Sequence, residues 1–264
     1  MRTVLVTGAS TGIGAACARR FVERGCRVLA GVRTPGDAPQ GTEELILDVT
    51  DGDAIAAAAA SVDRLDGLVN NAGIVVAAPL EFLPLDELRH QLEVNVVGQL
   101  AVTQAFLPAV RAAKGRIVVI GSIAGKSALP FLGAYAMSKH ALEGMVDSLR
   151  VELAPDGIHV AIIEPGTIAT PIWTKPRPLI DALPAEATER YGTRMDAFRR
   201  LAARRAAGAA APPETVVGAV EHALIAKQPK TRYLVGRDAK IRSAIERLPA
   251  RTRDRVIIRA LLGG

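Results

Sequence analysis

Tyr135 and Lys139 stand four residues apart in a segment whose apolar residues recur with a helical period. On a helix the two side chains lie one above the other on a single face. A free phenol titrates near ~10, and a cation within about 4–6 Å lowers such a pKa by roughly 1–3 units. Ser122 could donate a hydrogen bond to a substrate oxygen. The three residues therefore suggest an acid/base unit. Taken singly, a helical Tyr–Lys pair is commonly a surface pair, and a serine at a strand end is commonly a cap.

The predicted elements around these residues would bring them together. Residues 115–120 are a short β-branched run bounded by glycines, which is the pattern of a strand covered on both faces. Ser122 follows this run. The helical period continues to residue 153 and ends at Pro155. A strand, a loop and a helix would thus place Ser122 near Tyr135 and Lys139.

A glycine-rich turn joins the first predicted strand, residues 4–6, to the first predicted helix, residues 15–23. Its glycines remove side chains where the backbone must approach a ligand, and the free N–H groups of a helix amino-terminus favour a phosphate. The spacing G-x-x-x-G-x-G departs from the general dinucleotide fingerprint G-x-G-x-x-G. The turn residues predicted to bind phosphate are Gly8, Ser10, Thr11, Gly12, Ile13 and Gly14.

Arg33 follows the second predicted strand, residues 27–32. In a dinucleotide fold this strand end faces the adenosine ribose, where an acid would hold the 2′-hydroxyl and an arginine would hold a 2′-phosphate. Arg33 therefore favours NADP(H), with NAD(H) as the alternative cofactor and a solvated loop arginine as the plain interpretation. In the third predicted strand, residues 45–49, Asp48 could accept a hydrogen bond from the adenine amino group.

Small polar residues follow or interrupt later elements. Residues 67–73 predict a fourth strand and a turn, in which Asn71 can bond backbone groups and Gly73 permits close approach. Asn95 stands among valines in a long predicted helix, residues 85–110, and needs a partner if it is buried. Asn95 either marks a helix bend, where water satisfies the polar groups, or serves as a relay position.

The alternation of strands and helices with short connections predicts a single α/β domain, residues 1–264, built on a Rossmann-type doubly wound parallel sheet. A strand at residues 159–163 is followed by the Pro165–Thr170 segment at the same edge. The ligand crevice of such a sheet lies at the carboxyl ends of its strands. Every residue named above falls at that edge or on a helix bordering it, and this convergence carries more weight than any single motif.

Residues 171–213 interrupt the alternation with prolines and an arginine-rich helical stretch, residues 186–206. We interpret them as a helical substrate lid within the domain. A helix at 214–226 and a last strand at 231–235 precede a basic tail, residues 238–264, with two helical pieces around Pro249. Packing against the core or a subunit is the favoured role of this tail, and contact with an anionic membrane surface is the less favoured one.

Composition and charge argue against a nucleic-acid-binding, disulfide-linked, metal-binding or membrane-spanning protein. The net charge is +6, and residues 237–264 alone contain eight basic and three acidic residues, without aromatic interleaving or a nucleic-acid-binding motif. Cys17 and Cys26 give neither a disulfide framework nor metal-ligand spacing. No apolar run approaches the ~18–20 residues of a membrane span, and the chain enters a strand without room for a signal peptide. We therefore expect a reduced, cytoplasmic protein with no metal site and no nucleic-acid partner.

Assembled, these residues resemble the short-chain dehydrogenase/reductase family over roughly the first 235 residues. The glycine spacing that misses the general fingerprint is this family's own version. The Ala124-Gly125 and Leu129-Pro130-Phe131 segments look most like its hydroxysteroid and retinol dehydrogenase branch. The motifs that carry the resemblance are Thr7-Gly8 with Gly12-Ile13-Gly14, Asp48-Val49, Asn70-Asn71-Ala72-Gly73, Asn95, Ser122, Tyr135 with Lys139, and Pro165-Gly166 with Thr170.

The resemblance implies that Tyr135 is the general acid/base, that Ser122 positions the substrate oxygen, and that Lys139 modulates Tyr135 and binds the nicotinamide ribose. The cationic nicotinamide ring would add to the effect of Lys139. Asn95 would hold the water that links Lys139 to solvent. The implied cofactor-binding residues are Gly8, Ser10, Thr11, Gly12, Ile13, Gly14, Arg33, Asp48, Val49, Asn71, Ala72, Gly73, Tyr135, Lys139, Pro165, Gly166, Ile168 and Thr170.

The resemblance implies an NADP(H)-dependent oxidoreductase that interconverts an alcohol and its ketone or aldehyde on a lipophilic substrate of steroid, retinoid or fatty type. A 3-oxoacyl-thioester reductase would share all four catalytic residues. A catalytically silent dinucleotide sensor would usually have lost one of them. The resemblance also suggests a homodimer or homotetramer built through the helices at 85–110 and 134–153.

Overall fold

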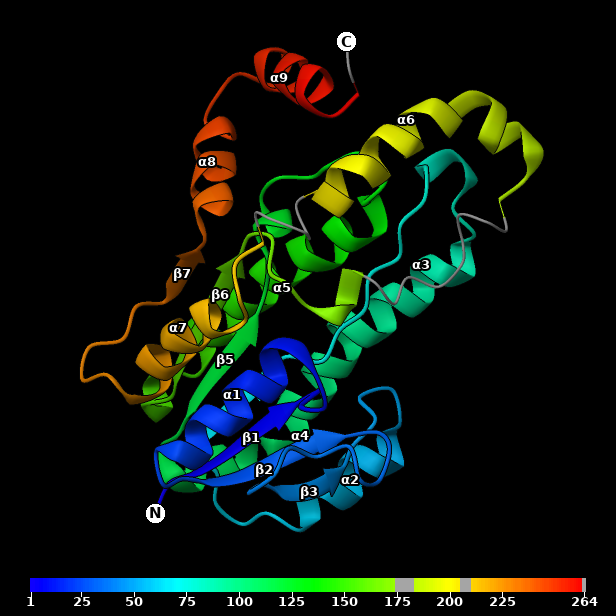
Figure 1. The fold of residues 1–264 in the computed structure, drawn as a ribbon. Coiled ribbons are helices and arrows are strands. Elements are labelled where there is room, and N and C mark those ends of the chain that lie inside the picture. The colour runs from blue at the N-terminus through cyan, green and yellow to red at the C-terminus, as the bar shows by residue number, and fades with distance from the viewer. Residues whose placement is uncertain (174–182, 205–209, 263–264) are drawn as a thin grey trace.

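A computed structural model describes residues 1–173, 183–204 and 210–262. In these residues a parallel seven-stranded sheet has the strand order β3-β2-β1-β4-β5-β6-β7 (Figure 1). From β1 the chain adds β2 and β3 on one side of the sheet, and then β4 to β7 on the other side. The doubly wound sheet predicted from the sequence is therefore confirmed. The strands are β1 (Thr3–Thr7), β2 (Arg27–Val32), β3 (Glu43–Ile46), β4 (Gly67–Asn70), β5 (Arg116–Ile120), β6 (His159–Pro165) and β7 (Arg232–Val235).

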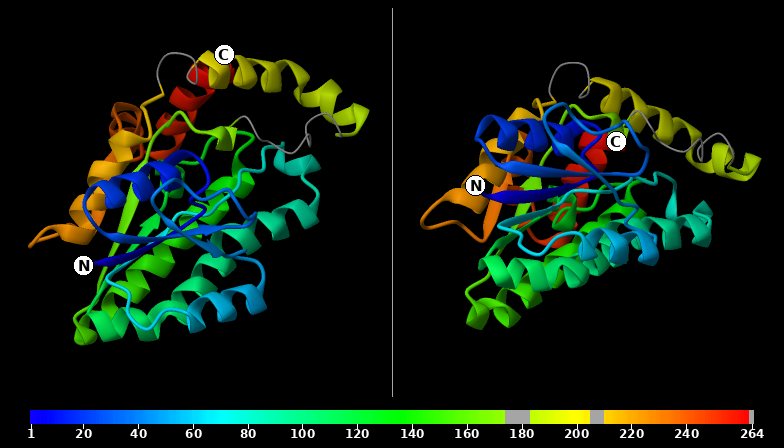
Figure 2. Two further views of the ribbon diagram at one scale, coloured as in Figure 1. Left: turned by 60° about the horizontal axis from the view of Figure 1, so that its bottom comes forward. Right: turned by 90° about the horizontal axis from the view of Figure 1, so that it is seen from below.

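Helices cover both faces of this sheet (Figure 2). A π-helical turn, Glu93–Val97, joins the third and fourth helices, and a short 3-10 turn, η3 (Ile123–Gly125), follows β5. The helices are α1 (Gly12–Glu23), α2 (Gly52–Ala60), α3 (Leu85–Leu92), α4 (Gly98–Ala113), α5 (Gly133–Glu152), α6 (Ala185–Arg204), α7 (Glu214–Ile225), α8 (Arg237–Ile245) and α9 (Ala250–Leu262).

The strands pack against both helical layers, because successive side chains of a strand point to opposite faces of the sheet. In β5, Val118 and Ile120 belong to the core shared with α1 and α7. Ile117 and Val119 belong to the core shared with α2, α4 and α5. Burial of each such side chain contributes about 1.5–3 kcal/mol. The two-sided core holds the carboxyl ends of the strands at a common edge.

The third strand differs from its predicted position at residues 45–49. It runs from Glu43 to Ile46, and Asp48 lies in the loop beyond it. The reason is local: Asp48 Oδ1 accepts hydrogen bonds from the Thr50 backbone N–H (2.9 Å) and hydroxyl (2.8 Å). An Asx-type turn of this kind ends the strand before Asp48.

The long helix predicted at residues 85–110 is divided by the π-helical turn at Asn95. By length and composition alone, the stretch Leu85–Ala113 could cross a membrane. No apolar stretch of that length was expected from the sequence. In the fold it belongs to a helical layer of the domain, where α4 contacts α2 and β4.

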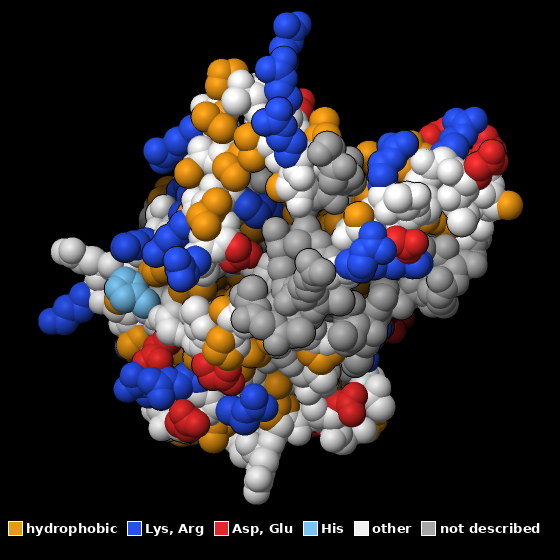
Figure 3. All heavy atoms as spheres, turned by 45° about the horizontal axis from the view of Figure 1, so that its top comes forward, with side chains coloured by type: hydrophobic (Ala, Val, Ile, Leu, Met, Phe, Trp, Pro, Cys, Tyr) orange, Lys and Arg blue, Asp and Glu red, His pale blue; other side chains and the backbone are white. Residues whose placement is uncertain are grey.

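The predicted tail helices around Pro249 are present as α8 and α9, here called the C-terminal arm. In Figure 1 this arm rises beyond the carboxyl end of β7, and α9 contacts α6. Figure 3 shows Lys and Arg side chains interspersed with hydrophobic ones on the upper face of the molecule. The predicted lid, residues 171–213, is represented by α6, and its segments 174–182 and 205–209 lie outside the described residues. The lid function stays a prediction.

Candidate active site

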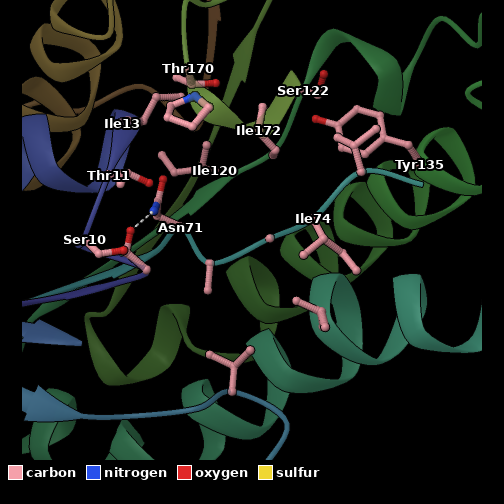
Figure 4. A pocket seen from close by; sticks show the side chains of 18 of the residues that line it. Ser10, Thr11, Ile13, Asn71, Ile74, Ile120, Ser122, Tyr135, Thr170 and Ile172 are labelled. Carbon is pink, nitrogen blue, oxygen red and sulfur yellow. Dashed lines mark hydrogen bonds between the residues drawn. The ribbon is translucent and has the colours of Figure 1, made fainter. Parts of the chain in front are cut away.

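A cleft of about 510 Å³ opens at the carboxyl edge of the sheet, where the strand order reverses between β1 and β4. Loops that follow β1, β2, β4, β5 and β6 line it. Its volume lies in the range of small-molecule and cofactor sites. Figure 4 shows Ser10, Thr11 and Ile13 at one end and Ser122 with Tyr135 at the other.

The glycine-rich turn has a shape that other residues could not adopt freely. Gly8 and Gly12 have φ angles of 62° and 58°, in the left-handed region. A Cβ on Gly14 would lie 2.3 Å from the Gly8 carbonyl oxygen and 2.5 Å from Asn71 Nδ2. Gly14 does not line the cleft. It lets α1 begin directly against the turn, so that the helix amino-terminus faces the cleft.

Asn71 fixes the same turn from the end of β4. Its Nδ2 donates hydrogen bonds to the carbonyl oxygens of Thr7 (2.9 Å) and Gly8 (3.1 Å). In return, the Asn71 backbone N–H donates to the Thr7 hydroxyl (2.9 Å). These bonds occupy the inward carbonyls of the turn, and the turn can present N–H groups to an anion.

The far end of the cleft holds Arg33, Asp48 and His90. Burial raises the pKa of Asp48, but hydrogen bonds from Thr50 and the charges of Arg33 and His90 outweigh this effect and lower the pKa below its ordinary value. The Asp48 carboxylate is therefore ionised at neutral pH. An acceptor and an exposed cation thus stand together where the sequence predicts the adenosine portion of a dinucleotide.

Three buried amide side chains, one turn apart on the long helix, hold the segment that follows β4. Gln99 Nε2 donates to the Ala72 carbonyl (2.9 Å). Asn95 bonds both the N–H (2.8 Å) and the carbonyl (3.0 Å) of Ile74, and Gln91 Oε1 accepts from the Val76 N–H (2.7 Å). This amide ladder supplies the backbone partners that β4 loses when it leaves the sheet.

Asn95 Nδ2 also donates to the Ser138 hydroxyl (3.1 Å), which links the ladder to α5 between Tyr135 and Lys139. Asn95 is fully buried and does not line the cleft. Its observed role is to join the segment after β4 to the helix that carries the acid/base pair. The water-holding role implied by the family resemblance stays a prediction.

Tyr135, Lys139 and Ser122 meet at the near end of the cleft. The Tyr135 phenol is hydrogen-bonded to Ser122, and Lys139 Nζ lies 5.7 Å from the centroid of the Tyr135 ring. Lys139 donates a hydrogen bond of 2.8 Å to the carbonyl of Ile120. Tyr135 and Lys139 are 6% and 4% exposed, so both ionisable groups are held in a nearly dry environment.

Burial dominates the electrostatics of this group. It raises the pKa of Tyr135, although the Ser122 hydrogen bond and the positive charge of Arg242 act in the opposite direction. Burial also lowers the pKa of Lys139 to about 8. The chain's own groups therefore keep the phenol protonated at neutral pH, ready to give a proton. Arg242 is thus a cation that lowers this pKa and that the family resemblance did not name. The role of Lys139 in lowering it stays a prediction.

The structure brings nearly all of the predicted cofactor residues to this cleft. Those that line it are Gly8, Ser10, Thr11, Gly12, Ile13, Arg33, Asp48, Val49, Asn71, Ala72, Gly73, Tyr135, Lys139, Pro165, Gly166, Ile168 and Thr170. Gly14 and Asn95 do not line it.

Sequence reasoning missed the apolar wall of the cleft, which includes Ile74, Val76 and Ile172. It also missed His90 and the amides of Gln91 and Gln99. The amides had a visible signal: with Asn95 they form an i, i+4, i+8 series on one helix. His90 had none, because only the tertiary fold places it near Asp48.

Helix α6 also carries a stripe of apolar side chains, among them Tyr191 and Phe198, that packs against the body of the domain. The Tyr191 ring lies 6.0 Å from Phe82 and 6.2 Å from Phe131, and Phe198 lies 5.6 Å from Phe131, all as edge-on pairs. Phe131 has a φ of 67°, which is unusual for an aromatic residue. The stripe thus secures α6 beside the loop that leads into Tyr135.

Comparisons with known proteins agree with this geometry. Residues 2–179 match the family model described as short chain dehydrogenase. The chain is 34% identical to the NADPH-dependent 3-dehydrocapnine reductase of Ornithobacterium rhinotracheale, over 99% of this chain and 98% of that protein. It is 39% identical to retinol dehydrogenase 16 of Homo sapiens, over 90% of this chain and 81% of that protein.

Solved structures show the same fold. A short chain dehydrogenase from Burkholderia cenocepacia in complex with NADP superimposes with a TM-score of 0.75 at 27% identity and covers 98% of both chains. A short-chain dehydrogenase from Streptomyces avermitilis gives a TM-score of 0.76 at 30% identity and covers 92% of this chain and 90% of that one. This chain belongs to the short-chain dehydrogenase family, in its retinol and hydroxysteroid dehydrogenase-like branch, and is an NAD(P)-dependent oxidoreductase.

Proposed function

We propose that the protein is an NADP(H)-dependent oxidoreductase that interconverts an alcohol and its ketone or aldehyde on a lipophilic substrate, with Tyr135 as the general acid/base. The observation that carries the proposal is the single cleft that joins the glycine-rich turn and Arg33 at one end to Ser122, Tyr135 and Lys139 at the other.

The residues present fit a nicotinamide dinucleotide. The cradle at Gly8 and Gly12 has no side chains, and the α1 amino-terminus behind it favours a phosphate. Arg33 can pair with a 2′-phosphate beside Asp48, which supports NADP(H) over NAD(H). When bound, the dinucleotide supplies or accepts the hydride. The name of the 3-dehydrocapnine reductase and the NADP complex of the Burkholderia cenocepacia protein point the same way.

The chain's own residues would donate and accept the proton of the reaction. In the reducing direction, Tyr135 gives its phenolic proton to the developing alkoxide, and Ser122 fixes the substrate oxygen by a hydrogen bond. In the oxidising direction, Tyr135 must accept that proton, which requires positive charge near the phenol. Lys139, held at the Ile120 carbonyl, is placed to contact a ribose and to stabilise the phenolate.

The substrate class is supported by the apolar side chains near Tyr135. Ile74 and Ile172 line the same cleft as the phenol (Figure 4). Similar proteins are named for retinol, 17-beta-hydroxysteroids and 3-dehydrocapnine. An extended apolar substrate would therefore approach the phenol along this wall.

Initial rates test the proposal. Purified protein is mixed with NADPH or NADH and with a retinoid aldehyde, a steroid ketone or a 3-oxoacyl thioester. We expect turnover with NADPH on a retinoid or steroid carbonyl. Turnover on the thioester alone would overturn the substrate class in favour of the acyl reductase. NADPH binding without turnover on any carbonyl would overturn the enzymatic role in favour of a dinucleotide sensor.

The homo-oligomer predicted from the sequence is also part of this proposal. Large apolar side chains stay exposed on the helices expected to form the interface, at Val97, Met137 and Val151. Where exposed apolar residues join into one patch, they mark a contact with another protein chain. Light scattering should give twice or four times the 27.7 kDa chain mass, and a monomer would contradict this part. The cytoplasmic location stays a prediction.

A further inference from the structure

Helix α8 reaches back to the loop that follows β6. Asp238, in its first turn, accepts hydrogen bonds through Oδ2 from the Thr167 backbone N–H (2.7 Å) and the Thr167 hydroxyl (2.8 Å). Thr167 stands between Gly166 and Ile168, which both line the cleft. A side chain of the C-terminal arm therefore fixes the backbone of the loop that borders the nucleotide site.

The chain is shaped to allow this contact. A Cβ on Gly166 would lie 2.0 Å from Asp238 Oδ1. Gly236, with a φ of 103°, turns the chain from β7 into α8. The Gly166 N–H donates to the Val235 carbonyl (2.8 Å). Glycine on both sides of the carboxylate is what lets α8 pack so close to the sheet edge.

One turn further along α8, Arg242 reaches the other catalytic loop. It donates to the Ser127 hydroxyl (3.4 Å) and to the Ser127 carbonyl oxygen. Ser127 is buried, and its own N–H donates to the Ile123 carbonyl in η3 (2.9 Å). Helix α8 also packs on η3. Ser122 caps this turn by accepting a hydrogen bond from the Ala124 N–H (3.1 Å).

Arg242 also supplies charge to the site. Its positive charge lowers the pKa of Tyr135, against the larger effect of burial. The Tyr135 side chain is hydrogen-bonded to Ser122 after β5, lies beside Lys139 of its own helix and is under the charge of Arg242 from α8.

We propose that Asp238 and Arg242 are positioning residues of the active site. Through them α8 fixes the loops that follow β5 and β6, and Arg242 places its guanidinium on the turn that begins at Ser122, the hydrogen-bond partner of Tyr135. The inference rests on the proposed role of Tyr135. The C-terminal arm then helps to hold the active site in its working geometry, and its removal should impair the reaction.

The Arg242 half of the proposal is tested without any substrate. The chain has three tyrosines, and ultraviolet absorbance follows the ionisation of all of them as pH rises. Each protein is therefore titrated beside its own Tyr135→Phe derivative, and the difference between the two curves gives the titration of the Tyr135 phenol. Arg242→Gln keeps donors for Ser127 and removes the charge, and Arg242→Lys keeps the charge. We expect the Tyr135 midpoint to move to higher pH in Arg242→Gln and to stay near the parent value in Arg242→Lys.

Lys240→Gln is the matched control, because it removes one positive charge from an exposed position of the same helix. It should leave the midpoint unchanged. In the oxidising direction Arg242→Gln should lose about three- to tenfold in kcat at pH 7, and the loss should shrink as pH rises. An unchanged midpoint in Arg242→Gln, or an equal shift in Lys240→Gln, would overturn this half.

The Asp238 half is tested by binding. Asp238→Ala and Thr167→Val should each weaken NADPH binding by about five- to tenfold, and the double variant should weaken it by no more than the larger single effect. Additive effects would contradict a shared hydrogen bond, as would unchanged binding in Asp238→Ala. Failure of the proposed function would appear separately, as retained turnover in Tyr135→Phe.

Discussion

The Lys139 ammonium donates a hydrogen bond of 2.8 Å to the carbonyl oxygen of Ile120, the last residue of β5. The strand that leads to Ser122 therefore also holds the lysine that lies beside Tyr135. Lys139 is 4% exposed, and burial lowers the pKa of its ammonium from 10.5 to about 8. A lysine placed in this way costs stability when it is charged.

Lys139→Met should raise the melting temperature at pH 7 while it abolishes turnover. Below pH 8 the lysine is charged in both the folded and the unfolded chain, so burial costs the parent on the order of 3 kcal/mol there. As pH rises from about 8 toward 10.5, the folded protein loses this proton first and the cost disappears. Thermal melts across this range should show the advantage of the variant shrinking. An advantage independent of pH, or one shared by Lys240→Met, would contradict the buried charge.

Arg33→Ala should weaken NADPH binding by about 10- to 100-fold and leave NADH binding unchanged. A charge-assisted hydrogen bond of arginine to a phosphate contributes about 1.5–3 kcal/mol, and only NADPH carries the 2′-phosphate. Fluorescence titration with both nucleotides measures the ratio. Arg19→Ala, on the exposed side of α1, is the control. Equal losses for the two nucleotides would remove Arg33 from phosphate recognition.

Gly14→Ala should destabilise the protein by about 1–3 kcal/mol and weaken the binding of both nucleotides. The added methyl group meets the Gly8 carbonyl and the Asn71 amide, which are parts of the turn itself. Gly144→Ala on α5 is the matched control, because its added Cβ would meet no atom within 4 Å apart from its chain neighbours and the nearby backbone of its own helix. That control should gain about 0.5–1 kcal/mol. Normal nucleotide binding by Gly14→Ala would show that the turn tolerates displacement.

Local patterns were sufficient for much of the fold. The β-branched run of β5 and the helical period of α5 fixed the place of Ser122 relative to Tyr135. The glycines of the first turn predicted a close approach of the backbone to a ligand, and Gly8 and Gly12 line the cleft. These features depend on residues close in sequence, and the common edge followed from the rule that parallel strands end together.

Other features depend on contacts between distant segments. The Asp48 turn shortened β3 at a point where the apolar pattern continued. Asn95 was singled out as buried and polar, but its partners Ile74 and Ser138 come from two other segments. Arg242 and Asp238 lie in a tail that composition alone presents as basic and amphipathic. Only the turn at Gly236 brings them to the active site.

Binding and turnover measured side by side on Tyr135→Phe test the central claim most directly. NADPH affinity is followed by nucleotide fluorescence, and turnover by NADPH consumption with the best carbonyl substrate of the parent. The account predicts an affinity within about twofold of the parent and a rate lower by about 10³-fold, because the variant keeps the cleft and lacks only the proton donor. A rate close to that of the parent, with affinity intact, would contradict it.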